Sequence, residues 1–141
     1  MQQALQEAPV TKTSLSNVSI LCVDNYIDSL ELLKLSLELQ GAQVYAAISA
    51  EEALRIFATN RIDILVSDLA LPQTDGIALL KAVRKHSPPI PAVALTGISD
   101  AAVREKATAA GFDRYLVKPV DEDKLIKVIS DLVAKNRKLS A

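Results

Sequence analysis

Four side chains that can do chemistry stand at or just after the ends of short apolar runs. They are two carboxylates, a hydroxyl and an ammonium group, namely Asp24, Asp68, Thr96 and Lys118. Short aliphatic and β-branched runs separated by helix-like segments favour parallel strands. Because the carboxyl ends of parallel strands open onto one edge of a sheet, where ligands bind, we expect these four side chains to converge on one cleft.

Two carboxylates in one cleft repel each other unless a cation neutralises them. A hard divalent cation takes oxygen ligands, and Mg²⁺ suits a site that also receives phosphate. A carboxylate can accept a phosphoryl group, while a metal ion, an ammonium group and a hydroxyl hold the phosphoryl oxygens. The chemistry of Asp68 fits the acceptor, and that of Lys118 and Thr96 fits the phosphoryl-binding groups.

The elements that must position these residues alternate along the chain. We expect strands at about 18–23, 44–47, 62–67, 92–96 and 114–117, and helices at about 27–40, 49–58, 75–86, 99–111 and 121–135. Such alternation predicts right-handed crossovers and helices on both faces of a five-stranded parallel sheet. The plausible strand order is 2-1-3-4-5, a flavodoxin-like doubly wound α/β fold. Its switch point lies between the first and third strands, where Asp24 and Asp68 stand.

Length and composition limit the possible classes of protein. With 141 residues, half of them hydrophobic, the chain is most simply one domain. We expect the domain at 18–135, a flexible N-terminal tail at 1–17 and a C-terminal tail at 136–141. Acidic and basic residues are interspersed along the chain and give a net charge of −1, which argues against a surface that binds nucleic acid or membrane. The single cysteine, Cys22, reads as a buried thiol. No signal peptide or membrane-spanning stretch is visible, so we expect a soluble cytoplasmic protein.

The segments at the strand ends resemble those of response-regulator receiver domains of two-component signalling. These segments are ILCVD at 20–24, SDLALPQTDG at 67–76, ALTG at 94–97 and YLVKP at 115–119. No single one is decisive, but four in this order at strand ends are specific together. The resemblance covers about residues 18–135.

The resemblance implies a role for Asp68 and a metal. Asp68 would accept a phosphoryl group from a histidine kinase or a histidine phosphotransfer protein. Mg²⁺ would be held by Asp24, Asn25, Asp68 and the backbone carbonyl of Ala70. Thr96 would help to bind the phosphoryl group. The chain would be a signalling protein rather than a metabolic enzyme, with a protein as its downstream target and no direct contact with nucleic acid or membrane.

The resemblance also implies a conformational switch. In the family, the hydroxyl residue, here Thr96, moves toward the phosphate, and the aromatic residue on the fifth strand, here Tyr115, swings inward and remodels a protein-docking face. The bond before Pro119 is usually cis in the family, which would aim Lys118 at the site.

The chain departs from the family pattern after its first strand. Receivers usually carry two adjacent acids there, whereas this chain has Asp24 and Asn25. An amide oxygen can still coordinate, but one negative charge is missing, so we predict weaker Mg²⁺ binding. Ala70 and Ile98, each two residues after a site residue, are apolar and cannot orient an attacking water. We therefore expect slow autodephosphorylation.

The same residues argue against several other functions. Residues 25–28 are not the hydroxyl- and glycine-rich phosphate loop of a flavodoxin. Aspartate-nucleophile phosphatases need a second acid where this chain has Ala70, and Walker and Rossmann motifs are absent from the sequence. The serious alternative is a pseudo-receiver that takes no phosphate and acts as a docking module, which the missing second acid favours and Asp68, Thr96 and Lys118 oppose.

Overall fold

The computed structural model describes residues 14–71, 73–85, 89–97 and 99–140, in which five strands alternate with five helices. The strands are β1 (Ser19–Val23), β2 (Gln43–Ala47), β3 (Ile64–Ser67), β4 (Ala92–Thr96) and β5 (Arg114–Val117). The helices are α2 (Ile27–Glu38), α3 (Ala50–Thr59), α4 (Gly76–Lys85), α5 (Ala101–Ala110) and α6 (Glu122–Ser140). The alternation predicted from the sequence is confirmed.

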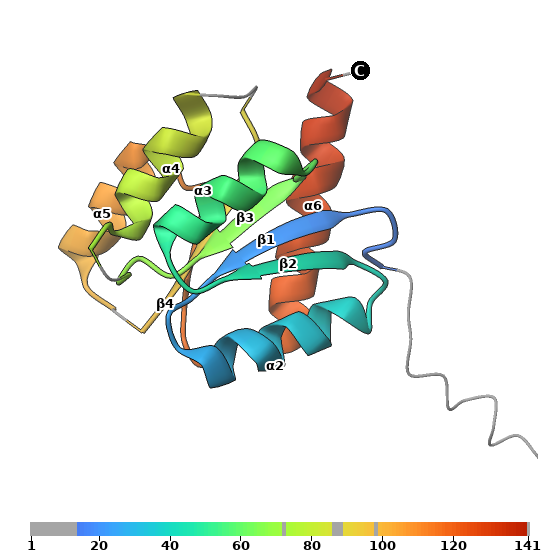
Figure 1. Ribbon diagram of the computed structural model, residues 1–141, viewed down its shortest axis with the longest axis horizontal. Helices are drawn as coiled ribbons and strands as arrows, with labels where there is room; N and C mark the ends of the chain where they lie inside the picture. The colour runs from blue at the N-terminus through green and yellow to red at the C-terminus, as the bar shows by residue number, and fades with distance from the viewer. Residues whose placement is uncertain (1–13, 72, 86–88, 98, 141) are drawn as a thin grey trace, which may run out of the picture.

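The strands form one parallel sheet in the order β2-β1-β3-β4-β5. The arrowheads of β1, β2 and β3 point toward the same edge in Figure 1. This is the predicted flavodoxin-like doubly wound fold, with its switch point between β1 and β3. The carboxyl ends of these two strands therefore lie side by side.

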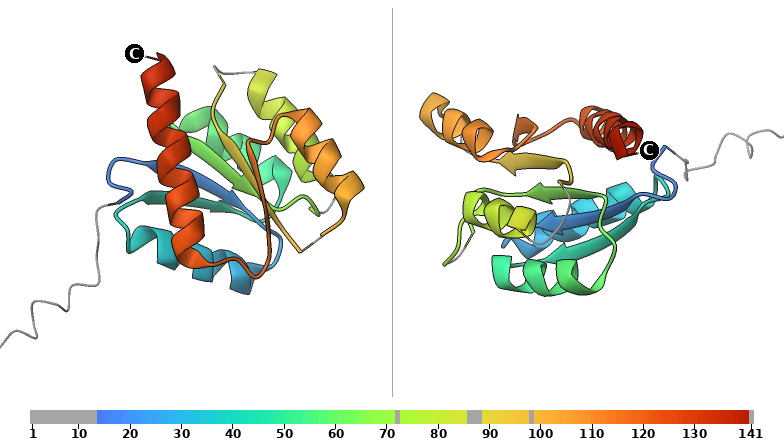
Figure 2. Two further views of the ribbon diagram at one scale, coloured as in Figure 1. Left: turned by 180° about the vertical axis from the view of Figure 1, so that it is seen from behind. Right: turned by 90° about the horizontal axis from the view of Figure 1, so that it is seen from above.

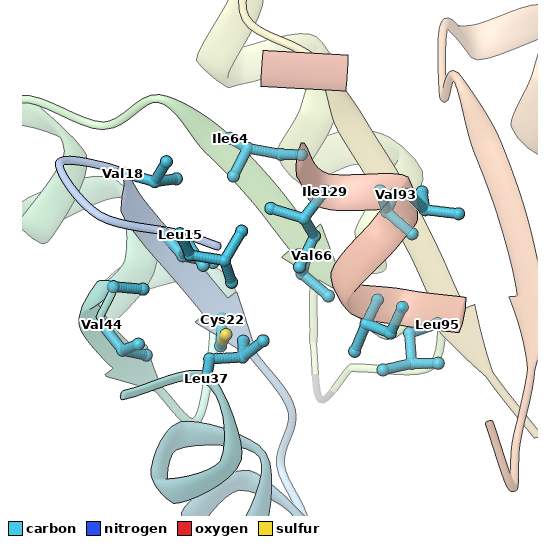
Figure 3. Close-up of a cluster of buried hydrophobic side chains, with 14 of the residues drawn as sticks. Leu15, Val18, Cys22, Leu37, Val44, Ile64, Val66, Val93, Leu95 and Ile129 are labelled. Carbon is cyan, nitrogen blue, oxygen red and sulfur yellow. The ribbon is translucent and has the colours of Figure 1, made fainter. Parts of the chain in front are cut away.

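Two apolar clusters cover the two faces of the sheet. On one face, side chains of α2 and α6 pack against alternate residues of the strands, and α6 lies in front of the sheet when the molecule is seen from behind (Figure 2). Cys22, Val66 and Ile129 belong to this cluster (Figure 3). On the other face, α3, α4 and α5 cover the remaining strand residues. Burial on both faces explains why the strands read as continuous apolar runs.

Polar side chains fix where three helices begin. The Ser49 side chain accepts a hydrogen bond from the Glu52 N–H at 3.1 Å at the start of α3. The Asp75 carboxylate accepts from the Ala78 N–H at 2.8 Å at the start of α4. Asp100 caps α5, since its carboxylate accepts from the N–H groups of residues 102 and 103. Each cap satisfies donors that the first turn leaves open.

Two boundaries differ from the sequence prediction. Helix α6, expected to end near 135, continues to Ser140. The Arg137 guanidinium donates to the Asn17 carbonyl at 2.7 Å and lies 3.3 Å from the Asp63 carboxylate, which ties the last turns to the sheet. Leu15, expected in the tail, is fully buried, and its N–H donates to the Gln40 carbonyl at 3.0 Å. One leucine in a polar segment gives no periodic signal, so the sequence did not reveal this anchor.

Within the described residues, no helix has the length and hydropathy needed to cross a bilayer.

Candidate functional site

The two acidic residues continue the hydrogen-bond ladder one step beyond their strands. The Asp24 N–H donates to the Ala47 carbonyl at 3.1 Å, and the Asp68 N–H donates to the Val23 carbonyl at 2.9 Å. Because β1 and β3 are neighbours, their carboxylates emerge at the same place on the edge of the sheet. The predicted convergence of Asp24 and Asp68 is therefore present.

Backbone N–H groups orient both carboxylates. Asp24 Oδ1 accepts a hydrogen bond from the Tyr26 N–H at 2.9 Å, and Asp68 Oδ1 accepts one from the Ala70 N–H at 3.0 Å. Each donor lies two residues after its acid, so the chain turns back over the carboxylate in a local Asx-type arrangement. One oxygen of each carboxylate is thereby fixed, and the other faces the neighbouring strands.

Lys118 joins the two carboxylates. Its N–H donates to the Thr96 carbonyl at 2.8 Å, which extends the β4–β5 ladder past the end of β5. Its Nζ lies 2.7 Å from Asp24 Oδ2 and 3.1 Å from Asp68 Oδ2. The side chains are largely enclosed, with 28% of Lys118, 7% of Asp24 and 11% of Asp68 exposed.

The surroundings of Lys118 favour its charged form. Partial burial by itself lowers the pKa of the Lys118 ammonium, but hydrogen bonds to Asp24 and Asp68, together with the attraction of both carboxylates, outweigh that effect. The pKa of Lys118 therefore lies above its ordinary value of 10.5. One cation is shared by two acids, and at neutral pH it neutralises part of their repulsion.

The other predicted residues take different positions. Thr96, the last residue of β4, is fully buried, and its carbonyl anchors Lys118. Asn25 and Ala70 are exposed at the mouth of the site, directly beside Asp24 and two residues after Asp68. The Lys118–Pro119 peptide bond is cis, as expected. Ile98, for which a role in phosphate lifetime was expected, lies outside the described residues.

Tyr115 lies apart from the acidic residues. It is half-buried on β5, at the margin of the apolar cluster under α5, and the Arg104 guanidinium of α5 lies 4.9 Å from its ring centroid. Ala94 of β4 pairs with it in register. The structure thus brings together Asp24, Asp68 and Lys118, and leaves Tyr115, one of the two predicted switch residues, on a neighbouring surface.

Gly76 is a supporting residue that sequence reasoning overlooked. Its N–H donates to the Leu69 carbonyl at 2.9 Å, and a Cβ at this position would lie 2.3 Å from the Asp68 carbonyl oxygen. Any larger residue would force α4 away from the backbone that carries Asp68. The signal was present in the glycine, but the close approach depends on tertiary structure.

The donor set at this site fits a hard cation with few protein ligands. Among the described residues, no group of three or more His, Cys, Asp and Glu side chains is gathered as for a metal. Two carboxylates, the Ala70 carbonyl and the Asn25 amide are nevertheless oxygen donors, and Mg²⁺ commonly binds through one or two carboxylates and retains several waters. The residues present are therefore compatible with Mg²⁺.

A groove leads into the site from one side. It has a volume of about 430 Å³ and reaches Asp24 and Lys118. Its apolar lining comes from α2, the end of β4, the segment before α6 and α6 itself: Leu32, Leu33, Leu95, Val120 and Leu125. Polar side chains line it as well, namely Ser29, Ser36 and Glu122. Leu32 of this groove is 68% exposed, and two further leucines, Leu35 of α2 and Leu39 directly after it, are 55% and 40% exposed.

Comparison with known proteins gives a consistent result. The family model of the response regulator receiver domain matches residues 20–130. An uncharacterized 14.6 kDa protein in the sodA1 3′ region of Leptolyngbya boryana is 39% identical over 118 residues, which are 82% of this chain and 90% of that protein. The transcriptional regulatory protein GlrR of Escherichia coli K12 is 35% identical over 112 residues, 79% of this chain but only 25% of GlrR.

The solved structures agree with the sequence relatives. The crystal structure of a CheY-like response regulator receiver domain protein from Methanospirillum hungatei JF-1 superimposes with a TM-score of 0.82 at 28% identity, covering 87% of this chain and 98% of that one. The chain therefore belongs to the response regulator receiver domain family, whose members are phosphorylated signalling switches of two-component systems.

Proposed function

We propose that this chain is a phosphoacceptor receiver that works in the cytoplasm. It takes a phosphoryl group on Asp68 from a histidine kinase or a histidine phosphotransfer protein and then switches a protein-docking face. The observation that carries the proposal is the setting of Asp68. Its carboxylate is oriented by the Ala70 N–H, lies 3.1 Å from the Lys118 ammonium and retains 11% exposure at the edge of the sheet.

The transfer itself requires little from the protein beyond positioning and charge. An oxygen of the Asp68 carboxylate bonds to phosphorus while the phosphorus–nitrogen bond of the donor phosphohistidine breaks, and the electron pair leaves with the imidazole nitrogen. Lys118 holds the phosphoryl oxygens electrostatically, and the Thr96 hydroxyl binds the transferred group. The phosphoryl group thereby replaces one of the two partners that Lys118 has in the resting protein.

Receiver domains generally bind Mg²⁺ at the phosphorylation site. In this chain Asp24, Asp68, the Asn25 amide and the Ala70 carbonyl would hold it, and the ion would neutralise charge on the phosphoryl oxygens. Because Asn25 supplies no negative charge, we expect weaker binding of Mg²⁺ than after Asn25→Asp. A Mg²⁺ titration of both proteins, followed by NMR of their backbone amides, tests this. Equal affinities would contradict it.

The groove beside the site is where the phosphodonor would dock. A donor helix that presents apolar side chains to Leu32 and its neighbours would bring its phosphohistidine toward Asp68, because the groove ends at Asp24 and Lys118. Leu32→Ser should slow transfer from a donor protein. It should leave phosphorylation by acetyl phosphate unchanged, because that small donor needs no docking surface.

The lifetime of the phosphorylated state would be long. Ala70 lies beside the acceptor with an exposed methyl group, which cannot hold a water for attack on phosphorus. Phosphate loss from the isolated protein should therefore be slow, and Ala70→Asn, which adds a polar side chain there, should hasten it. Rapid loss that Ala70→Asn does not change would reject this explanation.

The deciding experiment measures the intact mass of the protein after incubation with a small phosphodonor. The protein is incubated with Mg²⁺ and acetyl phosphate, with Asp68→Asn as the matched control. A mass increase of one phosphoryl group that is absent from the control supports phosphoryl acceptance on Asp68. No adduct at any Mg²⁺ concentration would overturn the proposal.

The alternative, a phosphorylation-independent pseudo-receiver, is favoured by one observation. Asn25 stands where receivers usually carry a second acid. If wild-type protein gains no phosphate but Asn25→Asp does, the missing carboxylate accounts for the loss and the pseudo-receiver is the better description. If neither protein gains phosphate, the pseudo-receiver also holds, but Asn25 is not its cause.

A further inference from the structure

Helix α5 is held to the domain by few apolar contacts. Of its ten residues, Ala101–Ala110, Ala107 is the buried one, and Val103 is half-buried against the cluster on its face of the sheet. A single small methyl group removes little apolar surface from water. Any further contact between α5 and β5 therefore carries an unusually large share of what keeps this helix in place.

The contact between Arg104 and Tyr115 is of this kind. The guanidinium of the exposed Arg104 lies 4.9 Å from the centroid of the Tyr115 ring, within the range of a cation–π interaction. Arg114, Lys124 and the carboxylate of Asp113 line the same hollow of about 360 Å³, and the π face of the Tyr115 ring attracts the guanidinium within it.

The contact exists only while the ring lies at the surface. Tyr115 pairs in register with Ala94 of β4, and Thr96 follows two residues later on the same face of the sheet. A ring that turned toward Thr96 would move past the small Ala94 side chain and away from α5. It would then lose the guanidinium, because Arg104 is fixed to the helix on the outer side.

We propose that Arg104 is a positioning residue that holds Tyr115 in the outward orientation of the resting protein. This proposal rests on the proposed function, in which inward movement of Tyr115 belongs to the phosphorylated state. Removal of the cation lowers the free-energy difference between the two ring positions. The resting protein then resembles the phosphorylated one more closely and accepts phosphate more readily. An exposed cation–π contact predicts an increase of roughly two- to five-fold in the inward population and in the rate.

The test combines fluorine NMR with phosphorylation kinetics. The three tyrosines are replaced by 3-fluorotyrosine, and the Tyr115 resonance is assigned with Tyr115→Phe. Arg104→Gln removes the charge at similar length, Arg104→Lys retains a cation, and Lys106→Gln removes a charge from an exposed position on the same helix. The rate of phosphorylation by acetyl phosphate is measured for each variant.

The expected result is specific to Arg104. In Arg104→Gln the resting Tyr115 resonance moves toward its position in phosphorylated wild-type protein, and phosphorylation is roughly two- to five-fold faster. Arg104→Lys shows a smaller change and Lys106→Gln none. A purely structural contact would lower stability without accelerating phosphorylation. An unchanged resonance in Arg104→Gln, or the same change in Lys106→Gln, overturns the proposal.

Failure of the proposed function gives a different result. If wild-type protein takes no phosphate, the rates cannot be compared and phosphoryl acceptance is refuted. The contact is still tested in the resting protein, because Arg104→Gln must move the Tyr115 resonance while Lys106→Gln leaves it in place.

Discussion

Helices α5 and α6 follow neighbouring strands, yet they are held in different ways. Four apolar side chains of α6, namely Leu125, Val128, Ile129 and Val133, are buried against the sheet, and Arg137 binds the far end of the helix to the Asn17 carbonyl. Helix α5 buries only Ala107 and depends on polar contacts at its two ends. One repeated βα unit thus produces a fixed helix and a weakly held one.

This difference matches the positions of two residues in or just after β5. Lys118 directly follows β5, and its ammonium lies within hydrogen-bond distance of both Asp24 and Asp68. The helix that follows Lys118 is α6, the firmly packed one. The ring of Tyr115, by contrast, faces α5, so a change there displaces a helix that buries little apolar surface. In the proposed switch, the firmly packed helix follows the residue that carries the charge, and the weakly packed helix covers the residue that would move.

Truncation of a core side chain should give the largest contrast between the helices. Ile129→Ala removes a fully buried side chain of α6, and we expect it to lower the free energy of unfolding by about 2–5 kcal/mol. Val103→Ala on α5 should cost less than about 1.5 kcal/mol, because only part of that side chain leaves apolar surroundings. Urea denaturation of both variants measures the difference. Equal losses would show that α5 is packed as firmly as α6.

Arg84 is the main polar attachment of the C-terminal end of α5. Its guanidinium, on α4, donates to the Gly111 and Ile90 carbonyls at 2.7 Å each and lies 3.4 Å from the Asp113 carboxylate. Arg84→Met should cost about 1.5–3 kcal/mol, because it leaves two carbonyls without their charged donor.

A matched control for Arg84→Met is Arg55→Met. Arg55 forms an exposed ion pair on α3, 3.6 Å from the Glu51 carboxylate, and its loss should cost about 0–0.5 kcal/mol. Hydrogen exchange should become faster at residues 107–111 in Arg84→Met alone. If the two variants are equally stable, Arg84 does not anchor α5.

Sequence reasoning predicted the parts of the molecule that depend on periodicity and strand ends. The strand order and the meeting of Asp24, Asp68 and Lys118 follow from alternation and from the rule that carboxyl ends share an edge. The family resemblance anticipated roles for Tyr115 and Asn25, which no contact in the resting structure tests. Both predictions belong to a phosphorylated or metal-bound state.

The remaining features depend on contacts between distant segments. Leu15 is isolated in a polar stretch, and Arg84 looks like one surface charge among many, yet each fills a place that other elements create. The Arg104–Tyr115 contact joins a helix and a strand through two side chains whose spacing in sequence has no helical or strand periodicity. Local patterns cannot encode such pairs.

The buried thiol of Cys22 on β1 makes the stability of the domain depend on pH. Burial, with a smaller contribution from the Asp24 charge, raises the pKa of Cys22 to about 12 from its ordinary value of 9.0. Between these values the unfolded chain ionises while the folded protein stays neutral. The neutral thiol therefore makes its full contribution to the free energy of unfolding below pH 9. That contribution is lost as the pH rises toward 12, by about 1.4 kcal/mol per pH unit.

Cys22→Ala isolates this effect from the titration of other groups. Between pH 8 and pH 10, the free energy of unfolding of the wild-type protein should fall by about 1.4 kcal/mol more than that of the variant. Urea denaturation at the two pH values gives the comparison. The folded thiol should also react with disulfide reagents at pH 8 only as fast as the whole domain opens. Identical pH dependence in both proteins would show that the β1 region is open to water.

The smallest expected effect concerns the first turn of α5. The Asp100 carboxylate accepts hydrogen bonds from the Ala102 N–H at 2.7 Å and the Val103 N–H at 3.4 Å. Asp100→Ala should cost about 1 kcal/mol, as should loss of the α3 cap in Ser49→Ala.

The two variants should nevertheless differ in hydrogen exchange. A weakly held helix opens by itself, so amides of 101–110 should exchange faster in Asp100→Ala by more than the global loss of stability explains. If exchange in α5 follows only the global loss in both variants, α5 opens together with the whole domain. The contrast with α6 would then be one of burial and not of freedom to move.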